Sequence, residues 1–282
     1  MIIKKIINNN IVSTNDINGR ELIVSGKGIG FGKKPGDPID KADVRKIYRM
    51  TSSDLQRRLI ELLDEMPYEH LKLADELVED ITEHVPHKLN EGLILTLADH
   101  VSFAIRRKEN GLEFSNTLLD AIMTYYPEEY EEGVRCLGII KDRLGVELKL
   151  DEAGFIAMHI VNAELNTKMD EMYEITEFIE ECVKVVEYYY DRQFDRKSLA
   201  FSRFIIHLRY FAQRLFAGAV LETNNEAGDE TFRRLIKQTC RTHYKCAECI
   251  AEFIKNKYDR DVTEEELIYL TIHLKRINLR SD

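Results

Sequence analysis

Four histidines stand at repeated positions in the last two thirds of this 282-residue chain. When His159 is aligned with His273, the four preceding residues match in character, FIAM against YLTI, and a tyrosine stands 29 residues upstream of each. His100 and His207 form a second pair, and each is followed three residues later by an aromatic residue. An imidazole can shuttle protons, bind a metal ion or carry a phosphoryl group.

The sequence around these histidines narrows the chemistry. All four stand in helical patterns with apolar neighbours, so any one of them alone is typical of a buried core histidine. Four at equivalent places instead favour a shared function. A phosphoryl group on an imidazole adds charge close to −2 and can repack an interface. Gly-x-Ser-x-Gly and His-Glu-x-x-His are absent from the sequence, so we expect the chain not to be an enzyme.

The elements that must position the histidines are helices. From Ser52 onward, apolar residues recur with a period of 3.6, and Ser52 or Ser53 can cap a helix that begins at Asp54. Helix-breaking residues divide the pattern into segments. They include Pro67, Pro86, Gly111, Pro127 and Gly145. Because the histidine motifs repeat after about 110 residues, we expect two homologous all-α helical-bundle domains, over 57–168 and 169–282.

The first 56 residues have a different texture. Short β-branched clusters alternate with turn residues, and Asn18-Gly19 between two apolar runs indicates a hairpin. Four glycines alternate with other residues over 26–32 and suggest a further strand that a neighbouring strand or an RNA can approach closely. We expect a small antiparallel β-sheet domain of four strands, with dimerisation to compensate for its small core. The predicted fold class is therefore multidomain α+β.

Charge separates these parts. Residues 1–60 carry 12 Lys and Arg against 6 Asp and Glu, whereas the rest carries 28 against 44. A basic module on an acidic body indicates that the first 60 residues meet a polyanion. No apolar run is long enough to span a membrane, and five cysteines without a secretion signal favour a reduced, cytoplasmic protein.

Two other patterns could suggest ligands, and neither is convincing. Cys240, His243, Cys246 and Cys249 follow one another at three-residue spacing in one helical stretch, whereas structural zinc sites usually need a turn between ligand pairs. The glycines at 26–32 do not form a phosphate-binding loop, because the required first glycine is replaced by Lys27. We therefore expect no metal and no cofactor.

Specific segments resemble one family. KKIINNNIVS, GRELIVSGKGIGFGKKPGD and IDKADVRKIY are similar to the co-antiterminator RNA-binding domain of BglG/SacY/LicT/GlcT-type bacterial transcriptional antiterminators. HVSFAI, GFIAMHIVNAE, FSRFIIHLRYFAQRL and LIYLTIHLKRI resemble the two PTS-regulation domains of the same family. The resemblance covers essentially the whole chain in the family's domain order, over 1–56, 57–168 and 169–282.

The resemblance implies that the N-terminal domain dimerises and binds a hairpin in an mRNA leader. Binding would keep a terminator stem from forming ahead of sugar-uptake and sugar-utilisation genes. Lysines would neutralise phosphates, an asparagine would bond to a base edge, and an exposed phenylalanine would stack on a base. By position in the matching motif, the implied RNA contacts are Lys5, Asn10, Gly26, Lys27 and Phe31.

The resemblance also implies control by phosphorylation. A sugar-specific PTS enzyme II would phosphorylate the first regulatory domain and inactivate the protein, whereas HPr would phosphorylate the second and stabilise the active homodimer. Asp99 would orient the ring of the neighbouring histidine. The implied phosphorylation sites are His100, His159, His207 and His273. GKGIGFGKK is closer to glucose-type antiterminators than to β-glucoside or sucrose types.

Two alternatives stay open at this point. A PTS-controlled DNA-binding activator can carry the same regulatory domains, but it predicts an N-terminal helix-turn-helix, against which the Asn-Gly hairpin and the glycine pattern argue. A zinc or phosphotransfer enzyme using the histidines predicts a catalytic pocket, and no motif supports it.

Overall fold

The computed structural model describes residues 1–49, 52–167, 169–217 and 227–277. The chain forms two compact units, one of residues 1–116 with 128–164 and one of residues 117–127 with 165–282. Lys168, at the expected boundary between the two helical domains, lies outside the described residues. The boundaries after residues 56 and 168 stay predictions.

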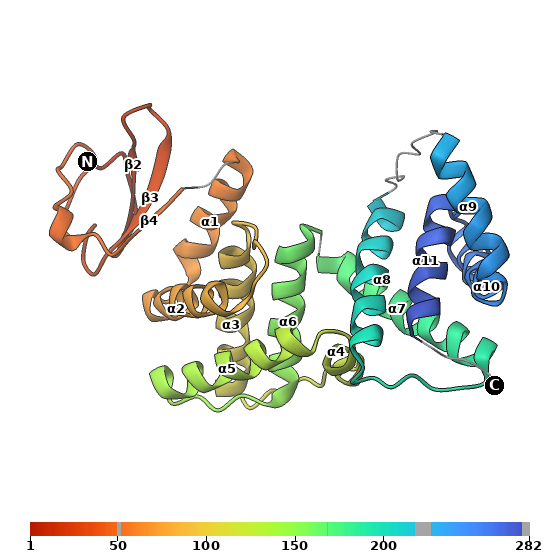
Figure 1. The fold of residues 1–282 in the computed structure, drawn as a ribbon. Coiled ribbons are helices and arrows are strands. Elements are labelled where there is room, and N and C mark those ends of the chain that lie inside the picture. Colours follow the sequence, from red (N-terminus) through yellow and green to blue (C-terminus); the bar gives the residue numbers. More distant parts are fainter. Residues whose placement is uncertain (50–51, 168, 218–226, 278–282) are drawn as a thin grey trace. The chain divides into compact units, whose positions relative to one another are not determined.

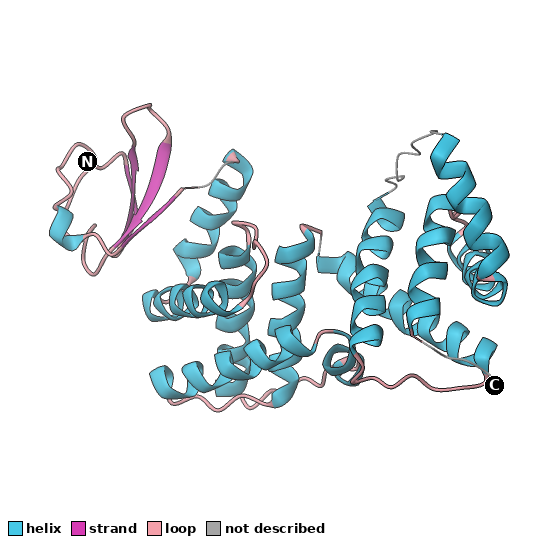
Figure 2. Cartoon of the chain, viewed as in Figure 1, coloured by secondary structure: helices cyan, strands magenta, loops and turns pink. Residues whose placement is uncertain are grey.

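The first unit begins with the expected four-stranded antiparallel sheet, in the order β1-β2-β3-β4. Figures 1 and 2 show the sheet at the N-terminal end of the chain, ahead of α1. The Asn18-Gly19 hairpin is confirmed, since it joins β2 to β3. Its turn is closed by the Asp16 carboxylate, which accepts 2.8 Å hydrogen bonds from the backbone N–H groups of Asn18 and Arg20. The strands are β1 (Lys5–Asn8), β2 (Ile11–Asn15), β3 (Glu21–Ser25) and β4 (Lys46–Tyr48).

The strand expected over the glycine-rich stretch is wrong. Residues 27–32 form consecutive turns, and the fourth strand lies further along the chain at Lys46–Tyr48. The reason is close backbone packing. A Cβ on Gly26 would lie 1.8 Å from the backbone oxygen of Asp43, and one on Gly30 would lie 2.6 Å from that of Asn8. The glycines therefore let a loop fold onto the protein's own backbone.

Helices make up the rest of the first unit, and their expected limits are largely confirmed. The Ser52 hydroxyl accepts hydrogen bonds from the N–H groups of Asp54 and Leu55, which caps the first helix as predicted. Leucine, isoleucine and valine side chains of α2, α3, α5 and α6 form the core of this bundle. The helices are α1 (Ser53–Glu65), α2 (Tyr68–His84), α3 (Leu93–Glu109), α5 (Pro127–Leu144) and α6 (Leu150–Leu165).

The sheet shares a core with the nearest helices of its own unit. Ile11, Ile23 and Tyr48 pack in one apolar cluster with Leu59 and Leu63 of α1. The Asn8 side chain adds a 2.8 Å hydrogen bond from Nδ2 to the backbone oxygen of Leu63. The sheet is therefore joined to the helical bundle by packing as well as by the chain.

The second unit is built from helices. Among the described residues it contains no strand, as expected for an all-α domain. Phe178 lies at its centre and packs edge-on against Phe211, Phe216 and Tyr258. No helix in the described ranges is both long and apolar enough to cross a bilayer. The helices are α4 (Leu119–Tyr125), α7 (Met169–Tyr190), α8 (Leu199–Ala217), α9 (Ala227–Thr239), α10 (Arg241–Tyr258) and α11 (Glu264–Arg276).

Candidate functional site

The first pair of predicted histidines comes together between α3 and α6. The rings of His100 and His159 lie with their centroids 5.0 Å apart, although the residues are 59 positions apart in the chain. Phe155, one helical turn before His159, packs 5.6 Å from the His100 ring. The two histidine motifs of this domain therefore form one site.

A carboxylate and a guanidinium complete this site. Nε2 of His100 lies 3.1 Å from Oε2 of Glu152, and the other carboxylate oxygen accepts a 2.6 Å hydrogen bond from Nη2 of Arg107. Both members of that ion pair are buried. The guanidinium carbon of Arg107 lies over the rings of Phe103 and Phe114, 4.9 and 4.2 Å from their centroids. The cation is fixed by packing as well as by charge.

The second unit builds the same group of four residues between α8 and α11. The rings of His207 and His273 stack with centroids 4.5 Å apart. Oε1 of Glu266 pairs with Nη2 of Arg214 at 2.8 Å, and Oε2 of Glu266 lies 3.9 Å from Nε2 of His207. Each domain therefore holds a His–Glu–Arg–His cluster, with the carboxylate between the first histidine and the arginine.

Burial keeps most of these imidazoles neutral. It lowers the pKa of His159 to about 3, with a smaller contribution from the neighbouring His100. It likewise lowers the pKa of His207 to about 3, assisted by His273 and Arg214. The pKa of His273 is also lowered, by burial and by Arg276. A neutral imidazole keeps a lone pair on one ring nitrogen, which is the form that can accept a phosphoryl group.

The arginines and glutamates of these clusters are functional candidates that the histidine motifs alone do not predict. The signal was present as His-x6-Arg, at His100 with Arg107 and again at His207 with Arg214. Seven residues are about two turns of helix, so both side chains lie on one face. The glutamates stand seven residues before the second histidine of each domain, in the first turn of their helices. They are Glu152 and Glu266.

The predicted partner of the first histidine lies elsewhere. Asp99 is exposed on α3, whereas the carboxylate that contacts His100 is that of Glu152. Neighbouring residues on a helix point about 100° apart, so Asp99 and His100 face different sides. A role for Asp99 in orienting the ring stays a prediction.

The predicted RNA contacts gather mainly around one loop of the sheet domain. The turn that contains Asn10 holds the glycine loop through backbone hydrogen bonds, from Gly26 N–H to the Asn10 oxygen and from Gly30 N–H to the Asn9 oxygen. The Asn10 side chain adds a third, because its Oδ1 accepts from the Gly28 N–H at 2.8 Å. Asn10 and Gly26 therefore lie together, as parts of the framework of the loop.

The other predicted contacts are exposed. Lys27 and Phe31 lie on the loop itself, and the Phe31 side chain is 72% exposed, unusual for a phenylalanine. Lys5 is exposed at the start of β1, in register with Ser13 of β2. The structure thus offers an aromatic ring and a lysine on one glycine loop, with a second lysine on the edge strand of the sheet.

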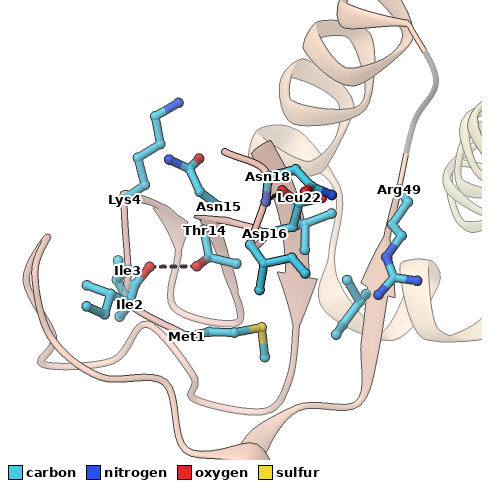
Figure 3. A pocket seen from close by; sticks show the side chains of 12 residues that line it. Met1, Ile2, Ile3, Lys4, Thr14, Asn15, Asp16, Asn18, Leu22 and Arg49 are labelled. Carbon is cyan, nitrogen blue, oxygen red and sulfur yellow. Dashed lines mark hydrogen bonds between the residues drawn. The ribbon is translucent and has the colours of Figure 1, made fainter. Parts of the chain in front are cut away.

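A hollow of about 850 Å³ opens elsewhere on the sheet domain, between the first residues of the chain and the β2–β3 hairpin (Figure 3). Lys4 and Arg49 stand at its rim, and the Thr14 hydroxyl donates a hydrogen bond to the backbone oxygen of Ile2 beside it. None of the five predicted RNA contacts lines this hollow. It is a feature separate from the glycine loop.

Within the described ranges, one group of possible metal ligands comes together, and a cation already occupies it. Asp80, His84 and Glu132 bring their ligand atoms within 4.8 Å of one another, but the Arg135 guanidinium already lies among them, 3.1 Å from Asp80 and 2.6 Å from His84. A fixed cation there disfavours a metal ion. The cysteine series does not lie in one helix as expected, because Cys240 is the turn residue between α9 and α10, and only the rest of the series lies on α10. His243 of that series contacts the Tyr190 hydroxyl at 2.5 Å.

Comparison with known proteins agrees with this arrangement. The family model of the CAT RNA binding domain matches residues 1–57, and that of the PRD domain matches residues 75–163 and 180–277. The chain is 38% identical to the transcription antiterminator LicT of Bacillus subtilis over 98% of this chain and 99% of that protein. It is also 38% identical to the beta-glucoside operon antiterminator of Dickeya chrysanthemi, over 98% and 96%.

A solved structure supports the same architecture. The crystal structure of GlcT CAT-PRDI superimposes with a TM-score of 0.51 and 33% identity, over 58% of this chain and 97% of that one. The relatives are regulators rather than enzymes, in agreement with the missing catalytic motifs. The chain therefore belongs to the transcriptional antiterminators that combine a CAT RNA-binding domain with two PRD domains.

Proposed function

We propose that this chain binds a hairpin in an mRNA leader and thereby keeps a transcription terminator from forming upstream of sugar-uptake and sugar-utilisation genes. The observation that carries the proposal is the exposed Phe31 on a basic glycine loop of the CAT domain. Exposed aromatic rings beside lysines are typical of proteins that stack on unpaired bases.

The loop suggests a division of labour among the predicted contacts. Phe31 stacks on a base, while Lys5 and Lys27 neutralise phosphates. The Oδ1 atom of Asn10 already bonds to Gly28, so its Nδ2 is the group we expect to donate to a base edge. Gly26 acts indirectly, because only a residue without a side chain lets the loop close against Asp43.

We further propose that the histidine clusters regulate RNA binding as phosphorylation sites. In the first PRD domain, a sugar-specific PTS enzyme II would phosphorylate His100 or His159 and inactivate the protein. In the second, HPr would phosphorylate His207 or His273 and stabilise the active homodimer. The paired rings of each cluster support this role, since burial keeps His159 and His207 neutral and the neutral ring is the nucleophile.

We infer two candidates for the inducing sugar from similarity. The full-length identity of 38% to a beta-glucoside operon antiterminator supports a β-glucoside as the first candidate. A glucose-type signal is the second candidate, favoured by the GKGIGFGKK stretch and by the likeness to GlcT CAT-PRDI.

A gel-shift titration tests the core of the proposal. The full chain is titrated into a transcribed leader hairpin from the neighbouring sugar operon, with duplex DNA of the same sequence as the control. We expect tight binding to RNA alone, weakening steeply with salt as phosphate contacts are screened. Equal binding to the duplex DNA would instead favour a PTS-controlled DNA-binding activator.

A further inference from the structure

In each histidine cluster, only one of the two carboxylate oxygens of the glutamate accepts a hydrogen bond from a described residue. In both units, one carboxylate oxygen pairs with an arginine and the other faces the first histidine. The facing oxygens, Oε2 of Glu152 and Oε2 of Glu266, are buried and complete no aligned hydrogen bond within the described part of the chain. Buried acceptors without a partner are rare and often mark functional places.

The same arrangement recurs in detail. It is built from the His-x6-Arg and Glu-x6-His spacings in both domains, and the arginine and glutamate that pair are 45 residues apart in the first and 52 in the second. An ion pair kept only for stability would not need an unsatisfied oxygen aimed at an imidazole, because a buried pair gains most when every oxygen is bonded. The repeated feature is therefore the carboxylate between histidine and arginine.

A phosphoryl group on the first histidine would change this balance. It would bring a charge close to −2 beside a carboxylate that lies only 3.1 Å from the ring in the first unit. Two anions at that distance repel strongly in a buried site. The guanidinium that shares this carboxylate with His100, that of Arg107, would gain more from the phosphate than from Glu152, because a phosphate offers more charge and accepts a bidentate pair.

We propose that Arg107 and Arg214 bind the phosphoryl group on His100 and His207, and that Glu152 and Glu266 hold these arginines in the unmodified protein. The inference rests on the proposed function, since it assumes that these histidines are the phosphorylated groups. Each arginine exchanges its carboxylate for the phosphate, and the freed glutamate moves away with the first turn of its helix. That helix carries the second histidine of the cluster, so the exchange reaches both.

The two clusters differ in the exposure of the arginine and in the distance between the glutamate and the histidine. Arg107 is 7% exposed and enclosed by two phenylalanine rings, whereas Arg214 is 27% exposed. Oε2 of Glu266 also lies further from its histidine, at 3.9 Å against 3.1 Å. We expect Arg214 to exchange its carboxylate for a phosphate more readily than Arg107, because fewer packed side chains have to move.

A small phosphoryl donor tests the inference apart from any partner protein. The full chain is treated with phosphoramidate, and phosphate on each histidine is followed over time by peptide mass spectrometry at neutral pH. The lone pair of the ring nitrogen forms the new N–P bond, and the donor's P–N bond breaks with its electron pair leaving on ammonia. The imidazole keeps its proton on the other nitrogen.

Opposite effects are expected from the two members of the ion pair. Arg107→Met should shorten the lifetime of phosphate on His100 roughly tenfold by removing a charge-assisted hydrogen bond, and Arg107→Lys should restore part of it. Glu152→Gln should raise the rate of phosphorylation, because it removes the repelling charge. A merely structural pair would make both substitutions act in the same direction.

The second domain supplies the matched control. Arg214→Met should shorten the lifetime on His207 and leave His100 unchanged, while Arg143→Met removes an exposed arginine paired with Glu76 and should change neither. Equal lifetimes in Arg107→Met and the unsubstituted chain, slower phosphorylation in Glu152→Gln, or no phosphorylation of either histidine by phosphoramidate would overturn the inference.

A parallel reaction with phosphorylated HPr or enzyme II separates the two proposals. Effects seen with phosphoramidate but no transfer from either protein would retain the arginine exchange and reject the proposed PTS control. Transfer from the proteins without any effect of Arg107→Met would do the reverse.

Discussion

The Tyr48 hydroxyl donates a 2.6 Å hydrogen bond to Oδ2 of Asp75, which links the last strand of the sheet to α2. Both side chains are buried, and Nζ of Lys46 lies 3.1 Å from the other carboxylate oxygen. Burial raises the pKa of Asp75, against the opposing effects of Tyr48 and Lys46. The RNA-binding sheet and the first regulatory domain therefore share a buried polar contact whose loss is costly.

Replacing Tyr48 with phenylalanine should destabilise the first unit. The substitution leaves a buried carboxylate oxygen without its donor, which costs about 1–3 kcal/mol in the free energy of unfolding. Urea denaturation measures the change. Tyr188→Phe is the control, because Tyr188 is 90% exposed and its hydroxyl is free to meet water. Equal stability of Tyr48→Phe and the unsubstituted chain would show that the contact contributes nothing.

Much of the fold could be predicted from local patterns. The Asn18-Gly19 hairpin, the Ser52 cap and the helical repeat depend on residues close together in the chain, and all three are confirmed. The choice of the four histidines as candidates also rests on the repeat, and the structure brings the two histidines of each domain together. These features needed only periodicity, turn chemistry and self-similarity.

What the patterns could not provide depends on contacts between distant segments. The regular alternation of the glycine stretch predicts a strand, whereas the constraint on Gly26 is its close approach to the backbone of Asp43. Glu152 and Arg107 were missed as a pair because 45 residues separate them. Adjacency in the sequence suggests that Asp99 orients the His100 ring, but neighbouring residues lie on different faces of a helix, and Asp99 is exposed.

Replacing Gly26 with alanine should disrupt the RNA-binding loop. The new Cβ would lie 1.8 Å from the Asp43 oxygen, a distance that forces the backbone to move. We expect RNA affinity to fall by about tenfold or more, because Phe31 and Lys27 are carried on that loop. A filter-binding titration with the leader hairpin measures it.

Gly28→Ala is the control for that substitution. Nothing lies within 4 Å of a Cβ at Gly28, and only its positive φ of 71° costs stability, about 1–2 kcal/mol. It should weaken binding less than Gly26→Ala. The reverse order would mean that close approach to Asp43 is not what holds the loop.

Replacing Phe31 with alanine should weaken RNA binding without unfolding the domain. The ring is largely exposed, so its loss has little effect on the core, whereas a stacked base contributes about 1–3 kcal/mol. Affinity for the hairpin should fall about 10- to 100-fold at an unchanged melting temperature. Ile17→Ala, at a fully exposed position on the β2–β3 hairpin, is the matched control and should bind normally. Comparable losses in both variants would refute the assigned surface.

Aspartate at the four histidines should separate the two regulatory domains. A fixed negative charge at His100 or His159 should lower terminator read-through in a reporter assay by roughly tenfold, within the range of allosteric couplings. The same change at His207 or His273 should raise read-through or leave it unchanged. Asparagine at each position controls for loss of the imidazole alone. Identical responses at all four positions would contradict a two-domain switch.

The low pKa of His159 makes the stability of the first unit depend on pH. Its pKa is about 3 in the folded chain and near 6.5 when unfolded, so the unfolded state binds more protons between these values. The contribution of His159 to stability is complete above about pH 6.5 and is lost as pH falls toward 3, by up to about 1.4 kcal/mol per pH unit.

Urea denaturation from about pH 4 to about pH 7 measures the free energy of unfolding against pH. Its slope should be flatter for His159→Asn, by the equivalent of about one proton. His87→Asn, at an exposed position, should keep the original slope. Parallel slopes for His159→Asn and the unsubstituted chain would mean that the buried ring accepts its proton without unfolding.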